Sequence, residues 1–166
     1  TFPARFMLAA AMNPCPCGFL GDPRAHCRCS ADAVQRYRWR ISGPLLDRID
    51  LVAEMPRPAP AEMLGPPGET SARVRERVRA VRETSLQRQG CPNAGLEGRA
   101  LDRHAALDAK GRALLVRSAE KLGLSARAQT RVRRVARSIA DAAGAEGIEV
   151  HHLAEALSCR GLDRRG

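Results

Sequence analysis

Four of the chain's six cysteines are gathered in one short stretch, arranged as two Cys-x-Cys pairs. The pairs are Cys15 with Cys17 and Cys27 with Cys29, and turn-forming Gly and Pro residues lie between them. Four thiolates at this density in a polar loop suit a tetrahedral zinc ion, which can fix a loop that has no hydrophobic core. His26 could replace one sulfur, but four thiolates already complete the tetrahedron, so we favour an all-cysteine site.

A second group that could bind a ligand is a set of arginines on a helix predicted over residues 125–143. At about 100° per residue, Arg127, Arg131 and Arg134 share one face of that helix. Three guanidinium groups within two turns repel one another, and a bound phosphate would relieve the repulsion. The arginines could instead extend into water or pair with acids of other helices. Their spacing does not choose between these arrangements.

A third group interleaves cations with aromatic rings. Arg36, Arg38 and Arg40 alternate with Tyr37 and Trp39. Such a pattern offers phosphate contacts and base stacking to a nucleic acid. Ordinary packing of the two aromatic rings is an equal alternative, so these arginines are nucleic-acid candidates only.

The composition favours helices and phosphate-containing partners. The 166-residue chain has a net charge of +10, and its 28 basic residues are arginines except for Lys110 and Lys121. The arginine fork can bind two phosphate oxygens at once. A solvated surface shaped by arginine-rich codon usage is the alternative. Because only 3% of the residues are aromatic, the core must be aliphatic, which suits packed helices.

No membrane segment or export signal is expected. The apolar run at residues 6–12 is too short to cross a bilayer and lacks the layout of a secretory signal. We therefore expect a cytoplasmic protein without a membrane partner. In that compartment, clustered cysteines favour a metal over disulfides.

The rest of the pattern predicts the elements that must position these groups. Continuous apolar runs at residues 5–11 and 51–55 favour two short buried strands, although the alanines of the first run would also allow a short helix there. Ser30 is placed to cap a short helix that ends near Arg38. Prolines and glycines over residues 56–69 predict a linker. Further helices are expected at residues 71–89, 97–105, 108–122, 125–143 and 151–159, with Asp108 and Ser125 as caps and Gly90, Gly123 and Gly144 as stops.

These elements predict a mainly α fold with a small α/β part. Residues 1–55 would carry one or two short strands and the cysteine knuckle, and residues 70–166 a bundle of four or five helices. Helical spacing predicts two buried stripes. They are Val74, Val78, Val81 and Ser85 on one helix, and Val132, Val135, Ile139 and Ala143 on another. His151 and His152 diverge by about 100° on their helix, which makes them a poor metal pair.

Taken together, the motifs resemble the YifB/ComM family of magnesium chelatase-like AAA+ ATPases. The resemblance covers nearly the whole chain. The segments that carry it are Phe2-Pro3-Ala4-Arg5-Phe6, MNPCPCG at residues 12–18, ISGPLLDRIDL at 41–51, LGLSARAQTRVRRVARSIAD at 122–141, and HLAEALSCR at 152–160. It implies that residues 1–55 are the last part of the AAA+ core and residues 70–166 the helical lid.

The resemblance also implies ATP and magnesium as cofactors of the complete protein. The glycine-rich phosphate loop and the acidic magnesium-binding motif of the family would lie before Thr1. Both are required for phosphoryl transfer, so we expect no ATP hydrolysis from this chain alone. In the family's core the two strands would flank a strand that this chain lacks, and the first strand could therefore be displaced.

Residue roles follow from the resemblance position by position. Asn13 matches the polar sensor 1 residue, although Asn-Pro also favours a simple turn. Arg48 matches an arginine finger that is presented to a neighbouring subunit's ATP, and Asp47 could hold it in place or form only a local surface pair with it. Arg127 matches sensor 2, which reaches the γ-phosphate from the lid, with Arg131 as its support in nucleotide binding. The four cysteines match the family's own pattern, which favours zinc.

The family is associated with hexameric DNA motors that drive branch migration during natural transformation. The resemblance therefore implies a homo-oligomeric helicase-type motor with DNA as its partner. One alternative is a chelatase-type motor that remodels a metal-inserting partner. Another is a zinc-stabilised nucleic-acid-binding module without a motor role.

Overall fold

The computed structural model describes residues 6–160. Residue 5 of the first predicted strand and the motif residues 2–5 lie outside the described residues. The chain divides into two compact units, one ending at Gly43 and the other beginning at Pro44, and each is described by itself.

The first unit consists of an irregular segment, the cysteine loop and helix α1 (Ala31–Arg38). As predicted, Ser30 begins this helix. Its Oγ accepts a hydrogen bond from the Ala33 N–H at 3.2 Å, which satisfies one of the free amides of the first turn.

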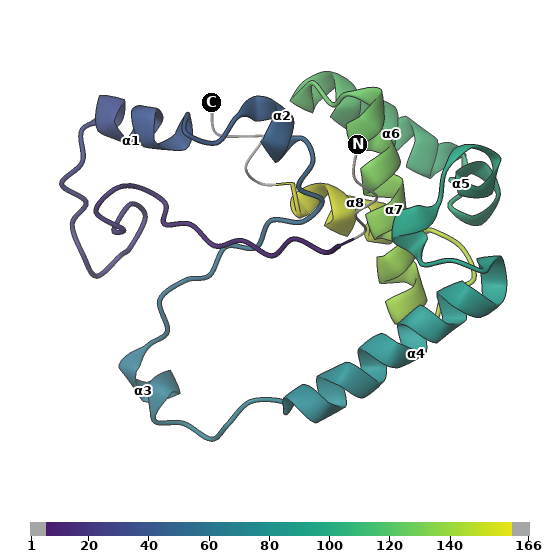
Figure 1. Ribbon diagram of the computed structural model, residues 1–166, viewed down its shortest axis with the longest axis horizontal. Helices are drawn as coiled ribbons and strands as arrows, with labels where there is room; N and C mark the ends of the chain where they lie inside the picture. Colours follow the sequence, from purple (N-terminus) through teal and green to yellow (C-terminus); the bar gives the residue numbers. More distant parts are fainter. Residues whose placement is uncertain (1–5, 161–166) are drawn as a thin grey trace. The chain divides into compact units, whose positions relative to one another are not determined.

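The second unit is helical, which confirms the mainly α prediction. Its elements, labelled in Figure 1, are α2 (Gly43–Leu46, which begins at the unit boundary), α3 (Pro60–Met63), α4 (Ser71–Gln89), the 3-10 turn η1 (Asn93–Gly95), α5 (Gly98–His104), α6 (Ala109–Leu122), α7 (Ala126–Ala142) and α8 (Val150–Ser158). Asp108 and Ser125 cap α6 and α7, and Gly90 and Gly123 end α4 and α6 in the left-handed conformation. Local signals therefore placed these helix ends within a residue or two.

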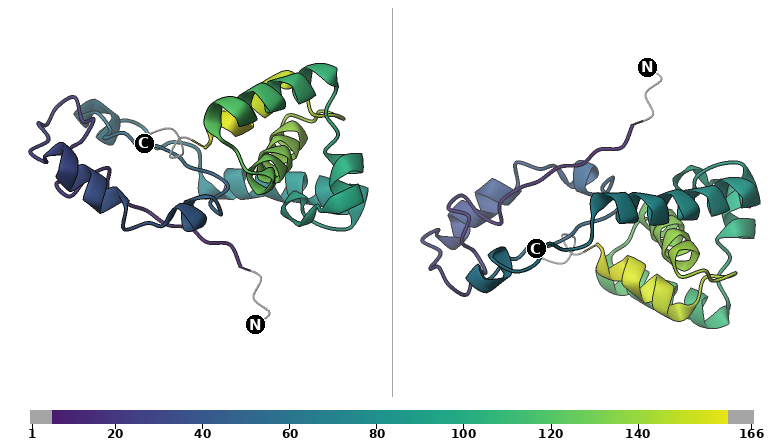
Figure 2. Two further views of the ribbon diagram at one scale, coloured as in Figure 1. Left: turned by 90° about the horizontal axis from the view of Figure 1, so that it is seen from above. Right: turned by 90° about the horizontal axis from the view of Figure 1, so that it is seen from below.

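Helix α7 lies at the centre of the bundle, between α4 and α8 (Figure 2). Its buried apolar face is Ala128, Val132, Ala136 and Ala140, packed against Leu153, Ala156 and Leu157 of α8, Leu115 of α6 and Leu101 of α5. The predicted stripe was wrong in part, because Val135 and Ile139 are only partly buried and Ala143 is exposed. Three of these four positions, which are spaced by four residues, carry small alanines that let neighbouring helices approach closely, so they occupy the centre in place of the larger residues.

Helix α4 has the predicted bounds but only half of the predicted burial. Ser85 is buried, whereas Val74 and Val78 are exposed. The first half of the helix extends beyond the bundle (Figure 1). Its stripe therefore has no packing surface among the described residues of this unit.

The two predicted strands do not form within residues 6–160. Phe6 and Met7 are exposed, and the Val52 N–H donates to the Cys159 carbonyl at 2.7 Å instead of to a strand. A strand is stabilised by backbone hydrogen bonds to a neighbour, and apolar character alone does not supply one. The pairing that the described residues do contain is an isolated parallel bridge between Leu107 and Ile148.

The two units divide between Gly43 and Pro44, and the predicted end of the first domain at residue 55 stays a prediction. Residues 44–55 belong to the helical unit and contact α7 and the end of α8. The linker at residues 56–69 and the lid at residues 70–166 stay predictions.

Candidate functional site

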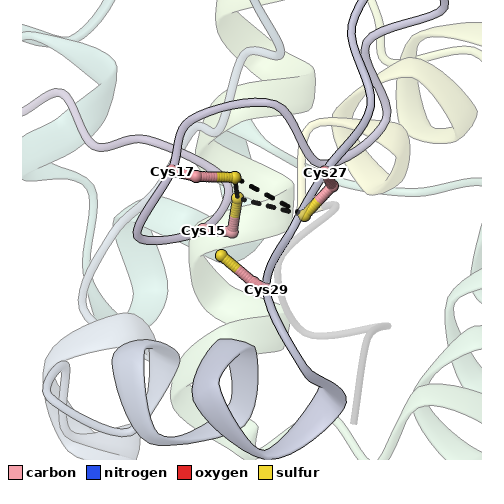
Figure 3. A group of neighbouring side chains, drawn as sticks. All are labelled: Cys15, Cys17, Cys27 and Cys29. Carbon is pink, nitrogen blue, oxygen red and sulfur yellow. Dashed lines mark hydrogen bonds between the residues drawn. The ribbon is translucent and has the colours of Figure 1, made fainter.

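The four sulfur atoms of the cysteine stretch meet at one point. Cys15 Sγ lies 3.4 Å from Cys17 Sγ and 3.7 Å from Cys27 Sγ, and Cys17 and Cys27 are 3.6 Å apart. All four ligand atoms, including Cys29 Sγ, lie within 4.8 Å of one another (Figure 3). A tetrahedron of sulfurs at about 2.3 Å from zinc has edges of roughly 3.8 Å, so the cluster has the dimensions that a metal ion of this kind requires.

The four thiols of the cluster differ in how easily they lose a proton. Backbone hydrogen bonds at Phe19 and Arg28 lower the pKa of Cys17 to about 6. At Cys29 a backbone hydrogen bond at Cys17 favours the thiolate, but burial and the three neighbouring thiols raise the pKa to about 12. One thiolate forms easily and the last one does not, so a cation is needed to hold four thiolates together.

A tight turn brings the first two cysteines to face each other. The Gly18 N–H donates to the Cys15 carbonyl at 3.0 Å, and Gly18 has a φ of 82°, a conformation that favours glycine. The side chain of Asn13 adjoins this turn, because a Cβ added at Gly18 would lie 3.8 Å from Asn13 Nδ2. Asn13 therefore lies beside the cluster of four cysteines. Among the described residues that cluster contains the four cysteines and does not include His26.

In the second unit the three predicted arginines line one cleft. The cleft has a volume of about 480 Å³. Its lining consists of Arg127, Arg131, Arg134, Ala126 and Thr130 of α7, together with Glu97, Gly98 and Leu101. The shared face predicted from helical spacing is thus confirmed.

The three arginines differ in their partners. Arg131 Nη1 donates to the Arg48 carbonyl and, at 2.8 Å, to Asp50 Oδ1. Arg134 donates to the Leu96 carbonyl at 2.7 Å and pairs with Glu97 at 3.4 Å. Among residues 6–160, Arg127 has no hydrogen-bond or ion-pair partner, and it is exposed. Two of the three predicted cations are therefore paired with an acid, and the third, Arg127, lines the cleft without an ion-pair partner among the described residues.

Arg48 lies on the short segment that follows α2. Its Nη1 donates to the Pro44 carbonyl at 2.8 Å, and the side chain is exposed. The expectation that Asp47 holds Arg48 was wrong. Asp47 instead accepts from Ser125 Oγ at 3.4 Å and lies 3.7 Å from Arg160 Nη2. The Asp47 carboxylate therefore contacts the capping serine of α7 and Arg160, which follows α8.

The arginines of α1 and of the residues that follow it are exposed or half-buried. Arg36 and Arg40 are exposed, Arg38 is half-buried, and Trp39 is 70% exposed. The alternative of ordinary packing does not apply to Trp39 in this structure. Tyr37 is half-buried.

Sequence reasoning missed two groups. Asp50 was not singled out, although it stands two residues from Arg48 and is the acid that pairs with Arg131. Arg137 is 2% exposed and pairs with Asp141 at 2.8 Å. An arginine and an aspartate four residues apart are a signal for such a pair, but the surrounding arginines concealed it.

Over the described part of the chain, each helix is too short or too polar to cross a bilayer.

Comparison with known proteins identifies relatives along the whole chain. Residues 1–64 match the family described as "Magnesium chelatase, subunit ChlI", and residues 68–160 match the one described as "Magnesium chelatase, subunit ChlI C-terminal". The chain is 45% identical to the competence protein ComM of Haemophilus influenzae, over 98% of this chain and 32% of the relative. It is 44% identical to the uncharacterized protein YifB of Salmonella typhimurium and 43% identical to that of Escherichia coli, in each case over 99% of this chain and 32% of the relative. The chain thus spans about a third of the length of these relatives.

Proposed function

The chain belongs to the magnesium chelatase ChlI family, and we propose that it supplies the nucleotide-sensing lid and the arginine finger of an ATP-driven homo-oligomeric motor that acts on DNA. In this proposal ATP and magnesium are bound by the full-length protein. The sensor and finger residues are Asn13, Arg48 and Arg127.

The observation that carries the proposal is the state of Arg127. It is the second residue of α7, at the end of the helix where the dipole and the first amide groups favour an anion. It faces a cleft, and its charge is not neutralised by the described residues, whereas Arg131 and Arg134 are each paired with an acid. A phosphate group is the natural partner of such a guanidinium. This arrangement suits a sensor 2 residue.

Arg48 suits a finger because it is exposed and anchored. The bond to the Pro44 carbonyl directs its guanidinium without placing an acid against it. Its charge thus remains available for a phosphate in a neighbouring subunit, where it would stabilise the transition state of hydrolysis. A ring, with six subunits as the expected number, would bring each Arg48 to the next subunit's ATP.

We propose zinc as the metal of the cysteine cluster. The sulfur separations fit a tetrahedron of thiolates, and backbone hydrogen bonds at Phe19 and Arg28 favour the Cys17 thiolate, the form of the side chain that binds a metal cation. The ion would fix residues 15–29, a loop in which Cys15 is the one buried hydrophobic residue that the structure describes.

DNA binding is assigned to α1 and the residues that follow it. Arg36, Arg38 and Arg40 would contact the backbone phosphates, and the exposed ring of Trp39 would stack on a base. A relative of this chain carries the name competence protein ComM, and the resemblance of the family to DNA motors supports this assignment.

The test is ATP turnover by the full-length protein with Arg127→Ala. Loss of the sensor should reduce the turnover number strongly, because a charge that stabilises the transferred phosphate is removed. Arg75→Ala is a matched control, since Arg75 is an exposed arginine on the free half of α4. Equal turnover in the wild-type and Arg127→Ala proteins would overturn the sensor assignment. Turnover that is unaffected by DNA would argue against the DNA motor.

A further inference from the structure

The segment that carries Arg48 is fastened to the lid at three places. Arg131 of α7 donates to the Arg48 carbonyl and to Asp50, and Ser125, the cap of the same helix, donates to Asp47 at 3.4 Å. At the other end of the segment, the Val52 N–H donates to the Cys159 carbonyl at 2.7 Å. These contacts join residues that are more than 75 positions apart in the sequence.

Arg131 makes the central contact, because it bonds both the backbone of Arg48 and the side chain of Asp50. One guanidinium nitrogen bonds the backbone of Arg48 itself, and it also bonds the carboxylate two residues later. The Arg131 side chain is 18% exposed, whereas that of Asp50 is 53% exposed. A pair with one exposed partner adds little to stability, so its effect is to fix position.

The same helix turn carries Arg127. Arg127 and Arg131 are four residues apart, one turn of α7, and both line the arginine cleft. A shift of α7 that brings Arg127 to a phosphate must therefore also move Arg131. Because Arg131 bonds the Arg48 carbonyl, the backbone of Arg48 must move with it.

We propose that Arg131 is a positioning residue that ties the finger Arg48 to the sensor helix, so that nucleotide occupancy in one subunit sets the position of the finger offered to the next. This inference rests on the proposed function for the roles of Arg48 and Arg127. The tie itself rests on the contacts of Arg131 and Asp50. Arg131 then acts through Arg48 and not by direct contact with the nucleotide.

The experiment uses Arg131→Gln and Asp50→Asn, each of which removes the charge from one side of the tie. Arg133→Gln is the matched control, because Arg133 lies on the same helix, is 20% exposed and pairs with Asp102 at 3.0 Å, away from the Arg48 segment. Hydrogen exchange of the amides of residues 48–52 measures the tie in the full-length protein. The turnover number and KM for ATP measure its consequence.

We expect faster exchange at residues 48–52 in Arg131→Gln and Asp50→Asn and unchanged exchange there in Arg133→Gln. The turnover number should fall between about 10- and 100-fold with KM unchanged, because a displaced catalytic group loses rate and not affinity.

Two results would overturn the tie. One is unchanged exchange at residues 48–52 in Arg131→Gln. The other is a raised KM in Arg131→Gln while Asp50→Asn is normal, which would make Arg131 a direct nucleotide ligand. Failure of the proposed function would give a different result, because the wild-type protein would then show no ATP turnover. The exchange measurement would still show whether Arg131 holds residues 48–52 in place.

Discussion

Arg88 of α4 and Asp141 of α7 are 53 residues apart in the sequence and form a two-point ion pair. The distances are 2.5 Å between Nη1 and Oδ1 and 2.9 Å between Nη2 and Oδ2. Arg137 and Asn93 complete the coordination of the same carboxylate, and Arg137 also donates to the carbonyls of Glu146 and Ala145. One buried aspartate thereby connects α4, η1, α7 and the loop before α8. These contacts lie in the helical unit that also carries Arg127.

Replacing Asp141 with Asn should destabilise the helical unit by about 3–5 kcal/mol, because two guanidinium groups lose their buried counter-charge. Thermal or urea unfolding of the chain measures the effect. Asp102→Asn serves as the control, since its side chain is 72% exposed and its pair with Arg133 should be worth about 1 kcal/mol or less. A similar loss in both variants would show that the network contributes no more than a surface pair.

The same aspartate should make the unit sensitive to acid. Burial disfavours the charged form of Asp141, but hydrogen bonds from Arg88 and Asn93 and the charge of Arg137 hold its pKa below the usual value. The contribution of Asp141 to the free energy of unfolding is therefore fully present above about pH 4, the ordinary aspartate pKa. It is lost as the pH falls through the lower pKa of this group in the folded state. The difference in unfolding free energy between wild type and Asp141→Asn should narrow below that pH. A constant difference would contradict this linkage.

Arg48→Ala should abolish ATP turnover in the full-length protein, since the finger supplies transition-state charge that no water can replace. Mixing this variant with subunits that cannot bind ATP should restore some turnover, because the second kind of subunit still offers an intact Arg48. Arg127→Ala should not be rescued in this way, as a lid residue serves its own subunit. Steady-state ATPase assays of mixed oligomers measure both, and rescue of Arg127→Ala would reverse its assignment.

Purified, reduced protein should contain one zinc ion per chain by elemental mass spectrometry. Removal of the ion by a chelator should unfold the loop at residues 15–29 and leave the helical unit folded, which circular dichroism and hydrogen exchange can separate. Cys27→Ser should reduce the zinc content, whereas Cys91→Ser, outside the cluster, should not. A metal-free wild-type chain with an unchanged loop would contradict the zinc proposal.

Replacing Arg36, Arg38 and Arg40 together by Gln should weaken DNA binding and flatten its salt dependence. Each lost phosphate contact should reduce the slope of log affinity against log salt by about 0.9 on duplex DNA. The matched control replaces Arg73, Arg75 and Arg79 of the exposed half of α4, which removes the same net charge from another surface. Equal effects of the two triple variants would attribute binding to net charge and not to α1.

Trp39→Ala tests the stacking contact by itself. Loss of the exposed ring should lower affinity for single-stranded DNA by about 1–3 kcal/mol and leave the salt slope unchanged, because stacking releases no counterions. Titration of fluorescent oligonucleotides at several salt concentrations measures both quantities. A change in slope without a loss of stacking energy would point to a displaced α1 instead.

The sequence by itself determined the features that depend on neighbours within about one helix turn. Ser30, Asp108 and Ser125 cap their helices, and Gly90 and Gly123 end theirs, because each of these needs only a local hydrogen bond or a tight turn. The two Cys-x-Cys pairs also lie close enough in the sequence, within residues 15–29, for one loop to bring their four sulfurs together.

Only the tertiary structure decided which of several similar residues is used. It buried the alanines of α7 in place of Val135 and Ile139, gave Asp47 to Ser125, paired Arg131 with Asp50 and left Arg127 facing the cleft. It also left the apolar runs at residues 6–11 and 51–55 without strand partners among the described residues. Side-chain periodicity reports which faces can be buried, but close packing and the competition of several arginines for few carboxylates are settled between elements that lie far apart in the sequence.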